Sequence, residues 1–149
     1  MVKDLRIEPC KEEHLTELVG LIKKFDKEAI SEYGMEMSES AVTDMFFNCK
    51  QHGLSLVIDG IARGVIAGLI TTPFHSKEKV WQEIIWYVEE PYRKYGVKLY
   101  KAMEKKLADE GISKMVMVLM HNSKKEKLED FYKSLGYRPM EYQFIKEIK

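Results

Sequence analysis

A short basic turn, Arg93-Lys94-Tyr95-Gly96, stands between two segments of different character. Before it, residues 80–88 are rich in β-branched and aromatic side chains, which favours a strand. After it, apolar residues recur at helical spacing as far as Leu107. A turn between a strand and a helix start is expected to offer unpaired backbone N–H groups beside the positive end of a helix dipole. Such a turn is suited to binding phosphate.

The turn resembles motif A of the GCN5-related N-acetyltransferase (GNAT) family, whose signature is Arg/Gln-x-x-Gly-x-Gly/Ala. The corresponding residues here are Arg93, Lys94, Tyr95, Gly96, Val97 and Lys98. Arg93 and Gly96 match the signature, whereas Lys98 replaces a small residue. The resemblance implies that these six residues bind the pyrophosphate of acetyl-coenzyme A (acetyl-CoA). Lys98 could add positive charge beside the phosphates or crowd them, and the sequence leaves both interpretations open.

The composition is typical of one globular domain over residues 1–149, with 45% hydrophobic and 32% charged residues. The 24 basic and 24 acidic side chains balance, so no electrostatic signature of nucleic-acid binding is present. Apolar runs are too short to span a bilayer, and no signal-peptide pattern opens the chain. Cys10 and Cys49 lack a metal-ligand or redox spacing, which predicts buried reduced thiols in a cytoplasmic protein.

Hydrophobic periodicity and turn residues predict the element order β-α-α-β-β-β-α-β-α-β. Strands are expected at residues 5–7, 54–58, 64–71, 80–88 and 114–121, with a last strand in which Tyr142 and Phe144 alternate with polar residues. Helices are expected from residue 15 to about 29, from a cap at Ser38 to 53, from 96 to 111, and from 123 to 136. Ser123 and Glu126 form the capping-box signature of the last helix.

This order is similar to the GNAT fold, an α/β (α+β) architecture with a mixed central sheet of six to seven strands flanked by four helices. The segment from Phe131 to Tyr137 also resembles the family's aromatic-Tyr-x-x-x-Gly-Phe/Tyr pattern. The resemblance implies an acetyl-CoA-dependent N-acetyltransferase that acts on a primary amine of a small molecule or protein, and by analogy a homodimer. The alternative is a non-catalytic CoA-binding or regulatory domain that keeps the fold.

The expected reaction needs a base, because only about one alkyl amine in a thousand is deprotonated at pH 7. Glu83 is the candidate for the base or for the residue that orients a base water, since related enzymes often carry a carboxylate on this strand. Burial would have to raise its pKa, and the competing interpretation is a solvent-facing glutamate. Glu89 and Glu90 are the next candidates.

The resemblance implies four further site positions. The backbone of Tyr87 and Val88 would pair with the pantetheine arm and face the thioester oxygen. Tyr132 would serve the leaving thiolate by a hydrogen bond, because a phenol is a weaker acid than a thiol; it could also be a core aromatic. Asn122 would contact the cofactor or cap the next helix. No metal site is expected.

Overall fold

The computed structural model describes residues 1–122 and 124–148. The sheet in this part of the chain has five strands in the spatial order β1-β2-β3-β4-β5. They are β1 (Leu5–Pro9), β2 (Gly53–Ile58), β3 (Ile61–Thr71), β4 (Val80–Val88) and β5 (Met115–Val116). The strands β1 to β4 pair antiparallel with one another, and β5 runs parallel to β4.

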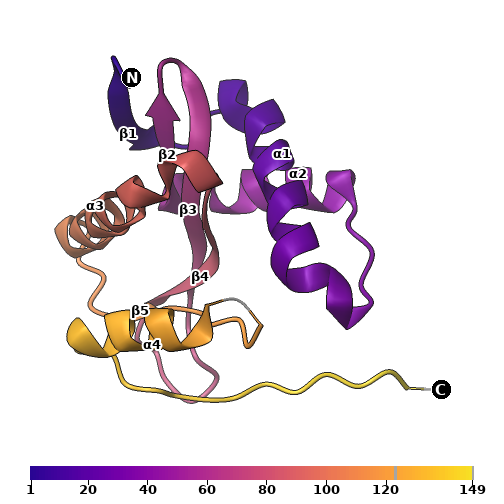
Figure 1. Cartoon of the computed structure of the whole chain (residues 1–149). Coiled ribbons are helices and arrows are strands. Elements are labelled where there is room, and N and C mark those ends of the chain that lie inside the picture. The colour runs from indigo at the N-terminus through magenta and orange to yellow at the C-terminus, as the bar shows by residue number, and fades with distance from the viewer. Residues whose placement is uncertain (123, 149) are drawn as a thin grey trace.

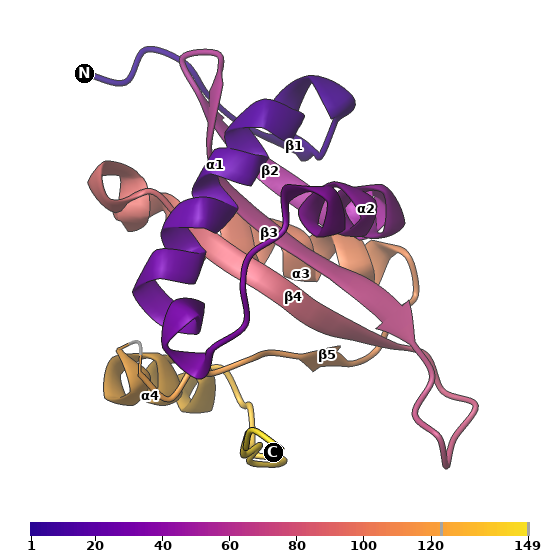
Figure 2. The same ribbon diagram turned by 90° about the vertical axis from the view of Figure 1, so that its right-hand side faces the viewer.

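Within residues 1–122 and 124–148, four α-helices cover the two faces of the sheet. They are α1 (Leu15–Phe25), α2 (Glu39–Cys49), α3 (Gly96–Asp109) and α4 (Lys125–Ser134). Figures 1 and 2 show α1 and α2 on one face of the sheet and α3 and α4 on the other side. No helix among the described residues is long and apolar enough to span a membrane.

The sheet separates two apolar clusters. The cluster under α1 and α2 includes Leu18, Leu21, Phe46, Ile85 and Tyr87. The cluster under α3 includes Trp81, Val88, Leu99, Tyr100 and Met103. Each helix contributes an apolar face at helical spacing, so the burial of these two faces fixes the helices on the sheet. The two cysteines are buried free thiols, as predicted.

Turn and capping residues mark several element boundaries in the structure. Asp59 and Gly60 turn the chain between β2 and β3 with φ of +49° and +85°. Ser38 caps α2 by accepting a hydrogen bond from the N–H of Ala41 at 3.3 Å. After α1 the chain continues as a π-helical stretch, Asp26–Ile30, and then a 3-10 turn that ends at Gly34. The predicted helix cap at Ser38 is confirmed.

The C-terminal part differs from the prediction. The strand expected at 114–121 is reduced to Met115–Val116, and residues 137–148 contain no strand. The sheet therefore has five strands in the described residues and not six or seven, while the α/β class and the four helices are confirmed. The capping prediction at Ser123 lies outside the described residues.

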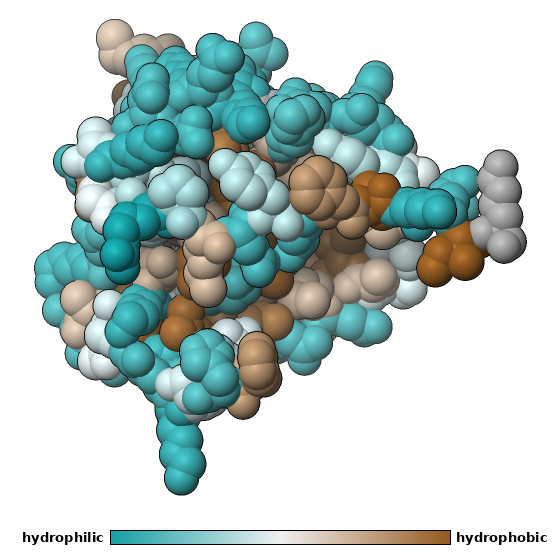
Figure 3. Space-filling view, turned by 90° about the horizontal axis from the view of Figure 1, so that it is seen from below, coloured by the Kyte–Doolittle hydropathy of each residue, from teal (hydrophilic) through white to brown (hydrophobic). Residues whose placement is uncertain are grey.

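The tail that follows α4 explains the missing last strand. Its alternating apolar side chains are exposed, with Tyr142 at 72% and Phe144 at 95%. In Figure 3 the tail projects at one side and carries hydrophobic surface. An alternating pattern forms a strand only when a neighbouring strand takes up its hydrogen bonds, and residues 137–148 pair with no described strand.

Candidate active site

An irregularity in β4 determines where its side chains point. Gly68 of β3 pairs with Glu83, and the preceding residue Ala67 pairs with Ile85, so Ile84 is an extra residue. Such a β-bulge shifts the alternation of side chains along the strand by one position. Consequently Glu83, which lies before the bulge, faces the same side of the sheet as Trp86, which lies after it.

Gly68 is required at this bulge because there is no space for a larger residue. A Cβ atom at this position would lie 2.2 Å from the carbonyl oxygen of Gln82 and 2.6 Å from the ring of Trp81. The glycine thus permits the close approach of β3 and β4 that aims Glu83 toward α4.

The pairing of β4 with β5 ends directly before the bulge. The N–H of Trp81 donates to the carbonyl of Lys114 at 3.0 Å, and a continued parallel ladder would bring the N–H of Val118 to the main-chain carbonyl of Glu83. Instead the N–H of Val118 donates to the carboxylate Oε1 of Glu83 at 3.0 Å. A side chain therefore takes the place of the backbone, and β4 and β5 diverge from this point.

Tyr132 contacts the same residue of the diverging chain. Its hydroxyl donates to the carbonyl oxygen of Val118 at 3.0 Å. The two side chains proposed from the sequence as catalytic, Glu83 and Tyr132, thus meet at Val118, although they are far apart in the sequence. They come from β4 and α4, on opposite sides of the opening between β4 and β5.

Burial gives Glu83 the properties of a base near neutral pH. The residue is only 8% exposed, and this burial raises the pKa of its carboxyl group to about 7, against the opposing effect of the hydrogen bond from Val118. In the described part of the chain Oε2 accepts no hydrogen bond. Oε2 is therefore the oxygen that can accept a proton, directly or through a water molecule.

Tyr132 remains a neutral phenol at all relevant pH values. Burial, followed by the nearby charge of Glu83, raises the pKa of its hydroxyl above the ordinary value. The ring is 8% exposed and packs beside Tyr137, with 5.3 Å between ring centroids. Tyr132 is thus a buried aromatic residue whose hydroxyl donates a hydrogen bond to the main chain of Val118.

The basic turn is more ordered than predicted. Residues Glu90–Tyr95 form a 3-10 helix that leads directly into α3. The N–H groups of Tyr92 and Gly96 donate to the carbonyls of Glu89 and Arg93, so these two amides are already paired. Pro91 at the start of this helix presets its φ angle, which explains why the expected open loop is helical.

The first turn of α3 carries the remaining residues of the motif. Val97 and Lys98 are exposed, as is Lys94, whereas Tyr95 is half-buried. Gly96 has an ordinary helical φ of −61°, and a Cβ there would come no closer than 3.8 Å to Val88. Gly96 itself is buried, and the exposed residues of this helix start are Lys94, Val97 and Lys98.

The open edge of β4 is formed by alternate residues. The N–H of Glu89 donates to the carbonyl of Arg63 on the β3 side at 2.8 Å. Since backbone groups alternate along a strand, those of Val88 and Trp86 face the opening, whereas those of Tyr87 face β3. Of the two backbone positions proposed from the sequence, Val88 lies on the open edge.

Two further predicted residues contact the segment after α1. Arg93 directs its guanidinium to Glu28, with Nη2 3.1 Å from Oε2, and Asn122 donates through Nδ2 to the carbonyl of Ala29 at 3.1 Å. Asn122 also donates to the carboxylate of Glu32. Sequence reasoning did not identify Glu28, because nothing in its spacing distinguishes it from other surface acids.

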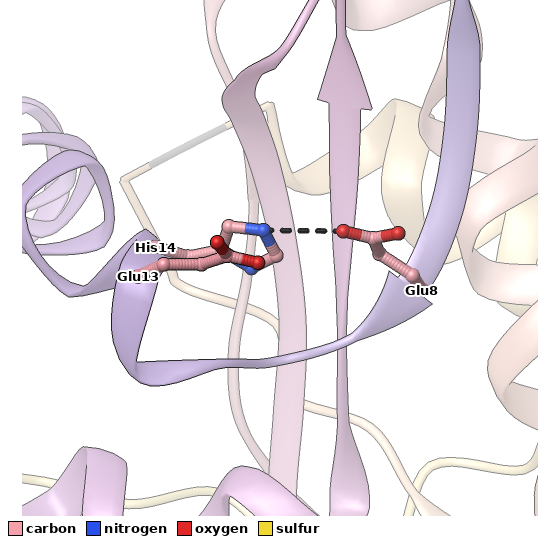
Figure 4. Close-up of side chains that lie close together, drawn as sticks. All are labelled: Glu8, Glu13 and His14. Carbon is pink, nitrogen blue, oxygen red and sulfur yellow. Dashed lines mark ion pairs between the residues drawn. The ribbon is translucent and has the colours of Figure 1, made fainter.

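A separate polar cluster lies at the start of α1. The ligand-type atoms of Glu8, Glu13 and His14 lie within 4.8 Å of one another (Figure 4). The Nζ of Lys11 is 3.6 Å from the carboxylate of Glu8 and 3.8 Å from that of Glu13. The Nε2 of His14 lies 3.2 Å from Oε1 of Glu8, so these side chains form an ion-pair network in which Glu8 is shared.

Comparison with known proteins identifies the class. A model of the acetyltransferase (GNAT) family matches residues 17–137. Because this match covers most of the chain, the chain belongs to the GNAT family, as the resemblance at the basic turn predicted. Its function is N-acetyl transfer. No curated protein matches the chain significantly.

Solved structures of this class share the fold. A ribosomal-protein-alanine N-acetyltransferase from Brucella melitensis biovar Abortus 2308 gives a TM-score of 0.73 at 13% identity, covering 98% of this chain and 100% of that chain. An acetyltransferase from Trypanosoma brucei gives 0.68 at 19% identity, with coverages of 97% and 100%. The aminoglycoside N-acetyltransferase AAC(6')-Iy in complex with CoA gives 0.70 at 15% identity, with coverages of 98% and 95%.

Proposed function

We propose that this acetyltransferase binds acetyl-CoA in the opening between β4 and β5 and transfers the acetyl group directly to a primary amine. The observation that carries the proposal is the replacement of the β4–β5 ladder by the side chains of Glu83 and Tyr132. It leaves an unpaired strand edge, a buried carboxyl group of raised pKa and a phenol donor around one opening. These are the groups that acetyl transfer to an amine requires.

The cofactor would be held at two places. Acetyl-CoA supplies a thioester whose carbonyl carbon accepts the amine. Its pantetheine arm would add to the β4 edge at Val88 as an extra strand does. Its pyrophosphate would lie at the start of α3, where Lys94 and Lys98 are exposed and the helix dipole is positive. The amides of Val97 and Lys98 are the candidate donors, because that of Gly96 is paired.

Each catalytic side chain would have one task. The ionised carboxylate of Glu83 takes a proton from the ammonium form of the acceptor, and its pKa of about 7 narrows the gap to an amine near 10. A backbone N–H on the open edge of β4 stabilises the developing oxyanion. Tyr132 donates a hydrogen bond to the departing sulfur, for which its hydroxyl must leave the carbonyl of Val118. Asn122 would contact the cofactor at the end of the opening.

The acceptor is proposed to be a cationic amine of a small molecule or protein. Aminoglycoside acetyltransferases and a ribosomal-protein-alanine N-acetyltransferase are among the structures with this fold. Glu32 stands beside the opening and is exposed, which suits a positively charged substrate. We further propose a cytoplasmic protein that does not bind nucleic acid and forms a homodimer; sedimentation with and without DNA would test the last two points.

Calorimetric titration with acetyl-CoA, followed by a thiol-release assay over a panel of amines, tests the proposal. We expect saturable binding with one site per chain and thiol release that depends on one class of amine. Binding without turnover on any amine would favour the alternative, a non-catalytic CoA-binding domain. Absence of binding would exclude both functions.

A further inference from the structure

Glu28, in the π-helical stretch after α1, contacts residues at the end of β4 and in the turn that follows it. Its Oε1 accepts a hydrogen bond from the hydroxyl of Tyr87 at 2.9 Å, and its Oε2 lies 3.1 Å from Nη2 of Arg93. The guanidinium of Arg93 also lies over the ring of Tyr87, 5.4 Å from its centroid. One carboxylate therefore holds both a phenol and a guanidinium that belong to the site.

Arg93 transmits this contact to the open strand edge. Its Nε donates to the carbonyl oxygen of Val88 at 3.0 Å. Nε and Nη2 are thus used within the protein, and the side chain points toward the α1 face of the sheet with Tyr87. The start of α3 lies on the other face. The guanidinium of Arg93 is therefore placed to join the stretch after α1 to β4, and not to extend over the helix start where phosphate is expected.

Residues 26–33, which include Glu28 and which we call the bridge segment, also contact the far side of the opening. Asn122, in the loop between β5 and α4, donates to the carbonyl of Ala29 and to the carboxylate of Glu32. Both Figures 1 and 2 show the end of α1 beside this loop. The bridge segment therefore touches the end of β4 on one side and the chain after β5 on the other.

The bridge segment begins with a π-helical stretch, Asp26–Ile30, and ends with a 3-10 turn, Ser31–Tyr33. A π turn contains one residue more than an α turn, so it changes the direction in which the following side chains point. Ala29 is 2% exposed and anchors the segment, while Glu28 and Glu32 lie on its accessible side. Stretches of π-helix within α-helices occur frequently at functional sites.

We propose that Glu28 is a positioning residue for acetyl transfer: through Arg93 and Tyr87 it fixes the bridge segment against β4 and thereby sets the approach of the acceptor amine. This inference rests on the proposed function, since it assigns the bridge segment to the acceptor side of that site. In this proposal Arg93 affects acceptor binding through its contact with Glu28. The pyrophosphate is then bound by the backbone N–H groups and the lysines of the turn.

The test uses the full-length protein with Glu28→Ala, Arg93→Ala and the double variant. Both side chains are partly exposed, and such ion pairs contribute little to stability, so the variants are expected to fold. Each single variant should raise the acceptor KM about fivefold to tenfold, the size of effect typical of one pair of interacting residues, and leave the acetyl-CoA Kd within about twofold. The double variant should be no worse than the more impaired single variant.

Two controls separate positioning from a general loss of structure. Asp26→Asn removes a carboxylate from the same segment and should leave the acceptor KM unchanged. Glu28→Gln keeps an oxygen for the hydroxyl of Tyr87 and should recover part of the effect. A tenfold or greater rise in the acetyl-CoA Kd with Arg93→Ala but not with Glu28→Ala would overturn the proposal, as would equal effects of Asp26→Asn.

Hydrogen exchange of the ligand-free protein gives a readout that does not depend on turnover. Glu28→Ala should accelerate exchange at residues 84–96, whereas Asp26→Asn should not. Unchanged exchange in Glu28→Ala would refute the link between Glu28 and β4. If this link is present and no amine is acetylated by the wild-type protein, then the proposed function fails and the proposal about the acceptor fails with it, while the contact itself stands.

Discussion

The two neighbours of β4 are paired to it in very different ways. On one side β3 pairs with β4 along the strand, from Gly64 opposite Val88 to Thr71 opposite Val80. On the other side β5 pairs only at Trp81 and Gln82. Beyond these residues the carboxylate of Glu83 binds the N–H of Val118 in place of a backbone carbonyl. A regular ladder therefore supports one edge of β4, and side chains hold the other edge open.

This difference explains how one strand can be both rigid and available to a ligand. The bulge at Gly68 belongs to the regular side, yet it determines that Glu83 faces α4 on the open side. Burial of Glu83 is the consequence, and burial raises the pKa of its carboxyl group to about 7. The chemistry proposed for the open edge thus depends on the packing of the closed edge.

Substitution of Glu83 by glutamine should change the pH dependence of stability. The pKa of Glu83 is raised from 4.5 to about 7, so the folded state binds this proton more tightly and wild-type stability falls as pH rises through about 7. Glutamine does not titrate. The free energy of unfolding of the variant should therefore increase relative to that of the wild type between pH 4 and pH 8, by roughly 3 kcal/mol at most. Urea unfolding at these pH values measures the gain, and a constant difference would contradict the raised pKa.

Gly68→Ala should weaken the regular edge. The new Cβ would clash with the backbone of Gln82 and the ring of Trp81, and we expect a loss of about 2 kcal/mol or more in the free energy of unfolding. Gly20→Ala is the matched control, because a Cβ in this α1 position meets no atom within 4 Å. It should be neutral or stabilising by about 0.5–1 kcal/mol. Equal stabilities of the two variants would refute the close approach at the bulge.

Tyr132→Phe should affect the open edge slightly. Loss of the hydrogen bond to Val118 is expected to cost about 1 kcal/mol of stability, and turnover should fall about tenfold or less because only one hydrogen bond to the thiolate is lost. Tyr100→Phe removes a buried hydroxyl that lies 2.6 Å from that of Tyr137 and has no assigned catalytic role. This variant should lower the free energy of unfolding and leave turnover unchanged. Full turnover in Tyr132→Phe would leave Tyr132 a packing residue.

The same comparison shows how much of the fold the sequence could reveal. The regular part follows from local signals, since the Asp59-Gly60 turn and the Ser38 cap act within a few residues. The last strand was wrongly predicted, because the alternation of Tyr142 and Phe144 indicates a strand but cannot supply its partner. Pairing depends on distant residues, which a single sequence does not place.

The candidate catalytic residues came from the resemblance to the GNAT family, and their roles stay predictions. Glu83 and Tyr132 were selected from the sequence, and the structure brings both to Val118. The bulge leaves no pattern in the sequence beyond an isolated glycine, and the contact between Glu28 and Arg93 spans many residues. The raised pKa of Glu83 likewise depends on burial, which the fold decides.

The pH profile of turnover in wild type and Glu83→Gln tests the central claim most directly. We predict that kcat/KM of the wild type rises with an apparent pKa of about 7 as Glu83 ionises, and that the variant is about 100-fold slower without this rise. The acetyl-CoA Kd should stay within about twofold, and Glu90→Gln, which alters an exposed acid of the turn, should behave as wild type. An unchanged rate and profile in Glu83→Gln would contradict the account.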